Sequence, residues 1–400
     1  MARFRRSPAV AIDPVAEHQV TIFERLDDLT RRVETLAPER SAMGVFLTVV
    51  ALLALGFLIQ VSHAATTVQP EHFAAEIRHL LQFRLLGLGV LLVGFHLGPR
   101  RLRPYVGYLT VAVVLMLIAV YVPFINAETN GSRRWIKIPL TGLTLQPSEL
   151  ARVVIVLWVA TSCLALGPRV RERNGYVPML AFGIALFALI LCQPDLGGAL
   201  LFLFCFICTM WVGGARPAHV AGSFGVLAAG AVFFGITMFG HVRERLAVWL
   251  GDGKNSQVWR AADAIASGDM WGVGLAQGAW RNNSLQYMQT DYVFSLVGEE
   301  LGFAGILLVL GLLTTFVWHS ARLVLSLRDR FSAHVAFGLL ISVALQAMLH
   351  AQVVTGLAPP KGMNLPFLSD GGTSLVASCL AVGIALGAVR DQTNNEASAS

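Results

Sequence analysis

The segment Gln289–Gly302 brings three carboxylates, Asp291, Glu299 and Glu300, to the point where a polar loop runs into a long apolar stretch. A carboxylate in a bilayer costs several kcal/mol unless it is paired or hydrated, so acids inside membrane spans are candidate functional groups. A positioned carboxylate can accept a proton from a hydroxyl group during group transfer. The alternative is structural: Asp291 lies at the membrane surface, and neighbouring helices satisfy the two glutamates.

The spacing of these acids separates their roles. On a helix, Glu299 and Glu300 lie about 12–14 Å further along the axis than Asp291, too far to share a proton with it. We therefore expect Asp291 to act near the water boundary. The glutamate pair is expected to be structural, with at least one member protonated or bonded to polar groups such as Gln346 and His350, which share a helix face.

A cationic cluster lies in a second polar segment, Asn130–Lys137, where Arg133, Arg134 and Lys137 surround Trp135. Arginine forks suit phosphate oxygens, and an indole suits a sugar face or the membrane interface. Cations on the outer side of a membrane run against the positive-inside trend, so an anionic ligand would explain them. A tryptophan anchor with arginines on lipid phosphates is the competing explanation.

Two further polar motifs flank predicted membrane helices. Ser148 can cap a helix, while Glu149 and Arg152 have the i, i+3 spacing of an ion pair at the outer end of a membrane helix. Capping explains Ser148 but not a Glu/Arg pair at membrane depth. Asp195 follows Pro194 in a tight turn and can be either a simple helix cap or a functional acid.

Composition sets the class of protein. The 400 residues are 55% hydrophobic and 14% charged, with a mean hydropathy of +0.64, which excludes an ordinary soluble domain. The isoelectric point near 9.3 reflects basic residues of the kind that mark the cytoplasmic side of a membrane protein, and does not indicate nucleic-acid binding. The five cysteines lie in apolar runs without the spacing of metal ligands.

Ten apolar runs predict an all-α membrane protein, a polytopic bundle of about ten transmembrane helices. The runs are Ala42–Val61, Phe83–Leu97, Tyr105–Phe124, Glu149–Leu166, Val177–Gln193, Gly198–Gly213, Ala218–Phe239, Tyr292–Trp318, Ala333–Val354 and Thr373–Val389. Arginine clusters follow the second, fourth and eighth runs and predict that both termini are cytoplasmic. A large extracytoplasmic loop, residues 241–291, then precedes the eighth span.

Residues 42–390 form the predicted membrane domain, and the two segments that flank it differ in sequence pattern. Residues 391–400 are small and polar, and predict a disordered cytoplasmic tail. Residues 1–41 form a cytoplasmic N-terminal tail with the heptad spacing of a short coiled coil that could bind a partner. A helix lying on the inner membrane face is the alternative. The heptad residues are Ile22, Leu26, Leu29, Val33 and Leu36.

Six motifs occur in an order that resembles one family. They are Asn130–Trp135, Gln146–Ala151, Gln193–Gly197, Ala264–Gly268, Thr290–Gly302 and Leu365–Leu375. Together with the predicted spans, they resemble the bacterial shape, elongation, division and sporulation (SEDS) family, which includes FtsW, RodA and SpoVE. The resemblance covers roughly residues 42–390, and Pro359–Gly362 is closer to the FtsW branch.

The resemblance implies a peptidoglycan glycosyltransferase that polymerises lipid II, an undecaprenyl diphosphate-linked disaccharide peptide, into glycan strands. The reaction would take place at the outer face of the bacterial cytoplasmic membrane, in cell division or cell-shape maintenance. A class B penicillin-binding protein is the implied partner, and no nucleic acid is involved. A lipid II flippase and a non-catalytic scaffold that recruits the transpeptidase are the alternatives, although the predicted acids cluster on the outer side.

The resemblance also assigns residues. The essential aspartate of the family falls on Asp291, the expected catalytic base. The acid and cation of its Gln-Pro-Ser-Glu motif fall on Glu149 and Arg152, and the acid of its Gln-Pro-Asp motif falls on Asp195. Cations would clamp the diphosphate, and a divalent ion could share that work, although no cofactor is certain. Further substrate-binding residues are expected to be Arg133, Arg134, Trp135, Lys361 and Ser369.

Four departures from the family pattern bear on rate and fine specificity more than on the reaction class. The usual Leu-Pro-Glu-x-His-Thr-Asp becomes Leu285–Asp291, which lacks the Pro, Glu and His. The common Ser-Tyr-Gly-Gly becomes Ser369–Gly372 with Asp370 as its second residue, which adds an acid near the outer surface. Arg152 stands where a lysine is usual, and Gly268-Asp269 replaces a Gly-Gly pair.

Overall fold

The computed structural model describes residues 38–124, 126–129, 132–138, 144–251, 257–280 and 288–399. The predicted coiled coil at Ile22–Leu36 lies outside these residues, and so does the side chain of Arg133.

Long helices make up the membrane part of the chain. In the described residues, eight helical stretches are long and apolar enough to span a bilayer. The stretch Pro70–Ala119 is 50 residues long and contains two helices joined by a short 3-10 turn, whereas α7 has only 17 residues. This confirms the helical membrane fold, and the count of ten spans stays a prediction. The helices are α2 (Pro38–Thr67), α3 (Pro70–Leu102), α4 (Val106–Ala119), α5 (Pro147–Leu166), α6 (Arg173–Leu191), α7 (Leu196–Val212), α8 (Pro217–Met238), α12 (Val293–Ser326), α13 (Arg330–Val354) and α14 (Gly372–Ala399).

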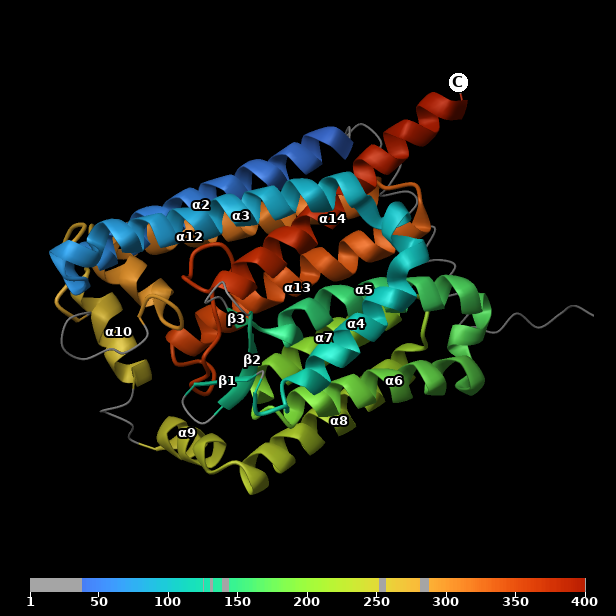
Figure 1. Ribbon diagram of the computed structural model, residues 1–400, viewed down its shortest axis with the longest axis horizontal. Coiled ribbons are helices and arrows are strands. Elements are labelled where there is room, and N and C mark those ends of the chain that lie inside the picture. The colour runs from blue at the N-terminus through green and yellow to red at the C-terminus, as the bar shows by residue number, and fades with distance from the viewer. Residues whose placement is uncertain are drawn as a thin grey trace, which may run out of the picture.

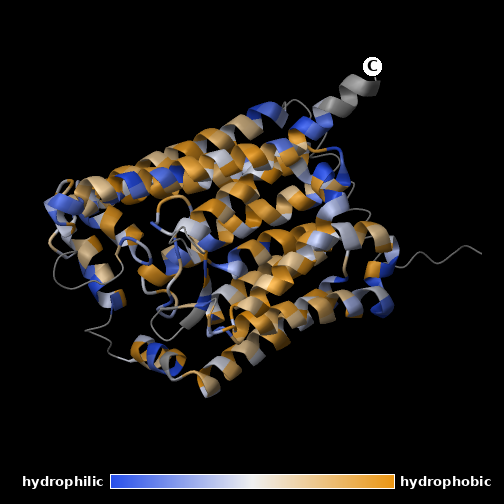
Figure 2. Ribbon diagram, in the orientation of Figure 1, coloured by the Kyte–Doolittle hydropathy of each residue, from blue (hydrophilic) through white to orange (hydrophobic). Residues whose placement is uncertain are grey.

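The helices form a bundle with unlike ends (Figure 1). Helix α3 packs along α14, α2 packs along α12, and α5 contacts both α4 and α7. Hydrophobic residues colour the middle of the helices, and hydrophilic residues gather at the two ends and around the strands (Figure 2). This distribution is the one expected of a bundle surrounded by lipid, because charged side chains avoid the hydrocarbon layer.

One end of the bundle carries additional small elements (Figure 1). Strands β1 (Asn126–Thr129), β2 (Ser132–Lys137) and β3 (Thr144–Leu145) form an antiparallel sheet in that order. Helices α9 (Gly240–Leu250) and α10 (Gln257–Ser267) lie in the predicted large loop. The sequence analysis expected no strand, because a six-residue strand beside membrane helices leaves only a weak pattern.

Local sequence explains where the helices near this end begin and bend. Proline occupies the first turn of α3 and α5, where its missing N–H costs no helical hydrogen bond. Helix α12 bends at Gly302, whose φ of +66° is open to glycine and strained for other residues. At the bend, the amides of Phe303 and Ala304 donate to the carbonyls of Asp269 and Met270, at 2.8 and 3.1 Å.

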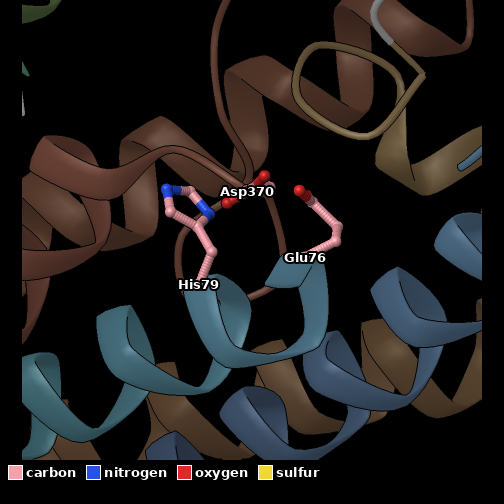
Figure 3. A group of neighbouring side chains, drawn as sticks. All are labelled: Glu76, His79 and Asp370. Carbon is pink, nitrogen blue, oxygen red and sulfur yellow. The ribbon is translucent and has the colours of Figure 1, made fainter. Parts of the chain in front are cut away.

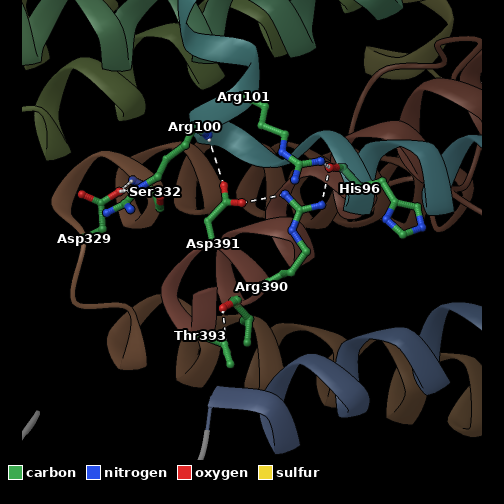
Figure 4. Close-up of polar contacts among 9 residues, drawn as sticks. His96, Arg100, Arg101, Asp329, Ser332, Arg390, Asp391 and Thr393 are labelled. Carbon is green, nitrogen blue, oxygen red and sulfur yellow. Dashed lines mark hydrogen bonds and ion pairs between the residues drawn. The ribbon is translucent and has the colours of Figure 1, made fainter. Parts of the chain in front are cut away.

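The opposite end is tied together by a charged cluster (Figure 4). Asp329 accepts hydrogen bonds from Ser332 and from Arg100 Nε, the latter at 3.2 Å. Asp391 accepts from the Arg100 amide and pairs with Arg390 at 2.6 Å. The cluster joins the end of α3, the start of α13 and the end of α14. Helix α14 continues past this cluster to Ala399, and the disordered tail expected at residues 391–400 stays a prediction.

Candidate active site

A polar cavity of about 560 Å³ opens at the end of the bundle that carries the sheet. It lies among β2, α5, α9 and the loops that precede α7, α12 and α14. Six of the site residues expected from the sequence line it, although their sequence positions span more than half of the chain. The six are Arg134, Trp135, Glu149, Asp195, Asp291 and Lys361.

Asp291 stands two residues before α12, in a loop held from several sides. The Gln289 carbonyl accepts from Gln60 Nε2 at 2.8 Å and from the Asp370 amide at 3.0 Å. Burial raises the pKa of the Asp291 carboxyl, while Arg245 and then Arg134 oppose that rise. A carboxyl with a raised pKa and cations nearby is suited to accept a proton.

Glycine at position 362 leaves room for this carboxylate. A Cβ atom at Gly362 would lie 2.8 Å from Asp291 Oδ2, which is closer than carbon and oxygen approach without displacement. Gly362 therefore belongs to the site as a residue that must stay small, a role that the Pro359–Gly362 motif did not reveal.

A second group of charges surrounds Asp195. Its Oδ1 accepts from the Gly198 amide at 2.9 Å and so caps α7, and it lies 3.5 Å from Arg134 Nη1. Arg134 also donates to the Pro194 carbonyl. Asp195 is thus both a helix cap and a cavity-lining acid, which combines the two interpretations that the sequence left open.

Lys361 reaches the same group from the loop before α14. Its side chain lies against Gly197, where a Cβ atom would overlap it. Burial lowers the pKa of Lys361 to about 8, although Asp195 acts to raise it, and Arg134 lowers it further. Lys361 is therefore close to the balance between its charged and neutral forms.

Glu149 and Arg152 form the expected ion pair, with 2.7 Å between Oε2 and Nη2. Glu149 lines the cavity together with Asp291, whereas Arg152 lies behind it with a side chain only 4% exposed. Arg152 does not itself line the cavity, because its side chain is buried in the bundle, and its assignment to substrate binding stays a prediction. Arg152 acts on the cavity through Glu149.

Ser369 also lies behind the cavity wall. Its hydroxyl donates to the Thr290 carbonyl at 2.6 Å and accepts from the Leu365 amide at 2.8 Å. This geometry joins the loop before α14 to the loop that carries Asp291. Direct contact of Ser369 with a ligand, as expected from the sequence, does not follow from its position.

Glu299 and Glu300 are buried and lie outside the cavity. Glu299 Oε1 accepts from the Trp280 amide at 3.0 Å, and Glu300 Oε2 accepts from the Ser62 hydroxyl at 2.6 Å. The partners expected from the sequence, Gln346 and His350, are wrong. Their side chains instead contact the Asn364 and Met363 carbonyls, because the loop before α14 lies between them and α12.

Several cavity residues were missed by the sequence analysis. Arg245 of α9, His79 of α3 and Gln257 of α10 all line the cavity. The charge run Arg243-Glu244-Arg245, directly after an apolar span, is the signal that could have identified Arg245. His79 and Gln257 carry no motif, and only the folded arrangement brings them to the site.

Comparison with known proteins identifies the relatives of this chain. Residues 42–394 match the FtsW/RodA/SpoVE family, described as cell cycle proteins. The chain is 31% identical to a probable peptidoglycan glycosyltransferase FtsW of Geobacter metallireducens, over 87% of this chain and 94% of that protein. It is 30% identical to stage V sporulation protein E of Bacillus subtilis, over 89% of this chain and 99% of that protein.

Solved structures share the fold as well. A chain from "Structural coordination of polymerization and crosslinking by a peptidoglycan synthase complex" superposes with a TM-score of 0.71 at 27% identity, covering 88% of this chain and 98% of that one. The rod shape determining protein RodA of Thermus thermophilus superposes with a TM-score of 0.63 at 27% identity, covering 87% and 96%.

Fold and cavity together define a helical membrane protein with a polar site at one end of its bundle. The chain belongs to the FtsW/RodA/SpoVE family. It is a multi-pass protein of the bacterial inner membrane.

Proposed function

We propose that this chain is a peptidoglycan glycosyltransferase that polymerises lipid II at the outer face of the membrane. The observation that carries the proposal is that Asp291, Arg134, Arg245 and Lys361 line the same cavity. A base and a cluster of cations are what sugar transfer from a diphosphate donor requires. Relatives at about 30% identity bear the name of this activity.

The reaction forms a bond between the acceptor 4-hydroxyl oxygen and the anomeric carbon of the donor, and breaks the bond from that carbon to the diphosphate oxygen. Asp291 takes the hydroxyl proton, a step that typically contributes about 10²–10⁴-fold to the rate. The diphosphate leaves with the bonding electron pair. Arg134 and Lys361 are positioned to stabilise its growing charge in a cavity partly screened from water.

The remaining residues position the substrates and these groups. Trp135 offers an indole face for a sugar ring. Asp195 holds Arg134 and Lys361 in place, and the ion pair with Arg152 fixes Glu149 at the wall. Arg133 remains assigned to the diphosphate by its motif, and Ser369 supports the site by holding the Asp291 loop.

The orientation of the chain in the membrane and its protein partner are also proposed. Arginine-rich loops at the end opposite the cavity favour cytoplasmic termini, which puts the cavity at the outer face, in cell division or cell-shape maintenance. A class B penicillin-binding protein is the proposed partner, which would cross-link the strands. Residues 1–41, with their heptad pattern, are proposed to recruit a partner and to be dispensable for polymerisation.

Purified protein supplied with lipid II tests the function directly. Wild-type protein should form glycan strands, and Asp291→Asn should lose about 10²-fold or more of this activity while it elutes and melts like the wild type. Asp263→Asn, an exposed acid of α10, is the matched control and should keep full activity. Strand synthesis unchanged by Asp291→Asn would overturn the mechanism. Wild-type protein that makes no strands but transfers lipid II between leaflets would be a flippase, and one that does neither would be a scaffold.

A further inference from the structure

Three side chains that the proposed reaction does not use meet at the rim of the cavity (Figure 3). Glu76 and His79 lie one turn apart on α3, and Asp370 comes from the loop before α14. A carboxylate oxygen from each acid and an imidazole nitrogen all lie within 4.8 Å of one another. The three side chains point toward one another from two separate elements (Figure 3).

The three ligand atoms, all within 4.8 Å of one another, need only small side-chain movements to surround a shared ion. Carboxylate and imidazole ligands bind a transition metal at about 2.0–2.2 Å, so they lie about 3–4 Å from one another. Within the described part of the chain, no hydrogen bond or ion pair joins these three side chains to each other or to another residue. Two carboxylates gathered in this way repel each other unless a cation lies between them.

Arg84 is the nearby cation that could substitute for a metal. Burial raises the pKa of the Asp370 carboxyl, and His79 and then Arg84 oppose that rise, so both are within electrostatic reach. The Arg84 guanidinium, however, donates to the carbonyls of Leu80 and Leu53, at 3.0 and 3.4 Å. These bonds, made by Nε and Nη1, hold Arg84 in the interface between α2 and α3, and Arg84 forms no ion pair with Asp370 among the described residues.

The cluster opens onto the proposed active site. His79 and Asp370 line the same cavity as Asp291. The Asp370 amide donates to the Gln289 carbonyl at 3.0 Å, which links the ligand loop directly to the loop of the catalytic acid. An ion held by these ligands would therefore have one side enclosed by protein and one side facing the cavity.

We propose that Glu76, His79 and Asp370 bind a divalent first-row transition metal ion of the Mn²⁺ or Zn²⁺ kind, with open coordination positions toward the cavity. One nitrogen and two oxygen ligands suit these ions better than Ca²⁺ or Mg²⁺, which prefer oxygen alone. Three protein ligands with an open position are typical of sites that also hold a substrate. Because Asp370 replaces the tyrosine of the related pattern, we infer that the site is specific to chains with this acid.

Within the proposed function, the open positions would take oxygens of the donor diphosphate. That step rests on the proposed function, whereas the metal site itself does not. Metal binding is therefore measured without substrate, so that a failure of the site and a failure of the glycosyltransferase proposal are separate results.

The test is equilibrium dialysis of the full chain in detergent, against Mn²⁺ and separately against Zn²⁺, followed by elemental analysis of metal per chain. Wild-type protein should retain one ion per chain. Asp370→Asn and His79→Gln should each weaken binding by roughly tenfold or more, since loss of a ligand exceeds the effect of losing a supporting residue. Glu71→Gln, an exposed acid in the first turn of the same helix, is the control and should bind like wild type.

Two results would overturn the proposal. One is folded wild-type protein that retains neither ion. The other is Asp370→Asn or His79→Gln protein that binds as tightly as wild type, which would place any bound metal elsewhere. His79→Gln also covers the case in which Asp370→Asn fails to fold, because its side chain is exposed and its loss leaves the loop before α14 intact.

Discussion

At the scale of single residues, the cavity combines groups whose pKa values shift toward each other. Burial raises the pKa of Asp291 and lowers the pKa of Lys361 to about 8. The base must be ionised and the lysine charged for the proposed reaction, so the ionisation of Asp291 should limit activity at acid pH and the neutralisation of Lys361 should limit it at alkaline pH. Such opposed shifts are characteristic of sites that carry out proton transfer near neutral pH.

Lys361 sets the alkaline side of this range. Its charge is present below a pH of about 8 and is lost above it, so wild-type kcat/KM should fall as the pH rises through about 8. Lys361→Arg keeps a cation at every accessible pH and should move the alkaline limb upward. Lys361→Ala should lower kcat/KM by about 10²-fold at neutral pH. Measured pH profiles with the same alkaline limb for wild type and Lys361→Arg would assign that limb to another group.

Glu299 should behave differently from Asp291, because it is buried away from the cavity and accepts a hydrogen bond from the Trp280 amide. Glu299→Gln can retain that acceptor only in one amide orientation, and Glu299→Ala leaves the amide without it. We expect Glu299→Ala to cost about 1–3 kcal/mol of stability. Thermal unfolding and turnover per folded molecule separate the two roles. Lost turnover at normal stability would move the base from Asp291 to Glu299.

At the scale of elements, the bend in α12 determines how the outer segment reaches the site. The loop after α10 crosses this bend, where the amides of Val273 and Gly274 donate to the carbonyls of Glu299 and Glu300, at 3.0 and 3.1 Å. A Cβ atom on Gly272 would overlap the Glu300 carbonyl oxygen. The helix that begins beside Asp291 therefore also anchors the large loop. The glutamate side chains add to this connection without lining the cavity, because Glu299 accepts from the Trp280 amide and Glu300 accepts from the Ser62 hydroxyl.

Gly302→Ala tests this element. Its positive φ and the backbone of Met270 beside it both oppose a Cβ atom, so we expect a loss of about 1–3 kcal/mol. Gly311→Ala in the same helix is the matched control, because its Cβ would meet nothing within 4 Å. That variant should be neutral or stabilising by up to about 1 kcal/mol. Equal melting temperatures for the two variants would show that the bend is not required.

The limits of sequence reasoning are visible in these elements. Glu149, Asp195, Asp291 and Lys361 could be predicted because each lies in a local motif whose chemistry is unusual for its setting. The partners of Glu299 could not be predicted, since they depend on a loop that crosses α12 only after folding. His79 and Gln257 reach the cavity from helices that carry no motif, so only the packing of α3 and α10 identifies them.

At the scale of the whole molecule, the two ends of the bundle have separate tasks. At the cavity end, loops pack against one another and form the proposed active site. At the opposite end, Asp329 and Asp391 join α3, α13 and α14. When these helices are held together at one end, their other ends also keep their relative positions, and so do the loops that form the cavity.

The pH dependence of stability at Asp329 tests whether the two ends of the bundle have separate tasks. Burial raises the pKa of its carboxyl, but hydrogen bonds from Ser332 and Arg100 outweigh burial and hold the pKa below its usual value. A depressed pKa stabilises the folded protein above the unfolded value, and this stabilisation disappears as the pH falls through the folded value. The melting temperature of wild type should therefore exceed that of Asp329→Asn at neutral pH, and the gap should narrow below about pH 4.

Turnover per folded molecule should be equal in the two proteins, because Asp329 lies at the far end from the cavity. If the difference in melting temperature stays constant with pH, the charge of Asp329 is not its cause. Reduced turnover of Asp329→Asn would show that the two ends of the bundle are coupled.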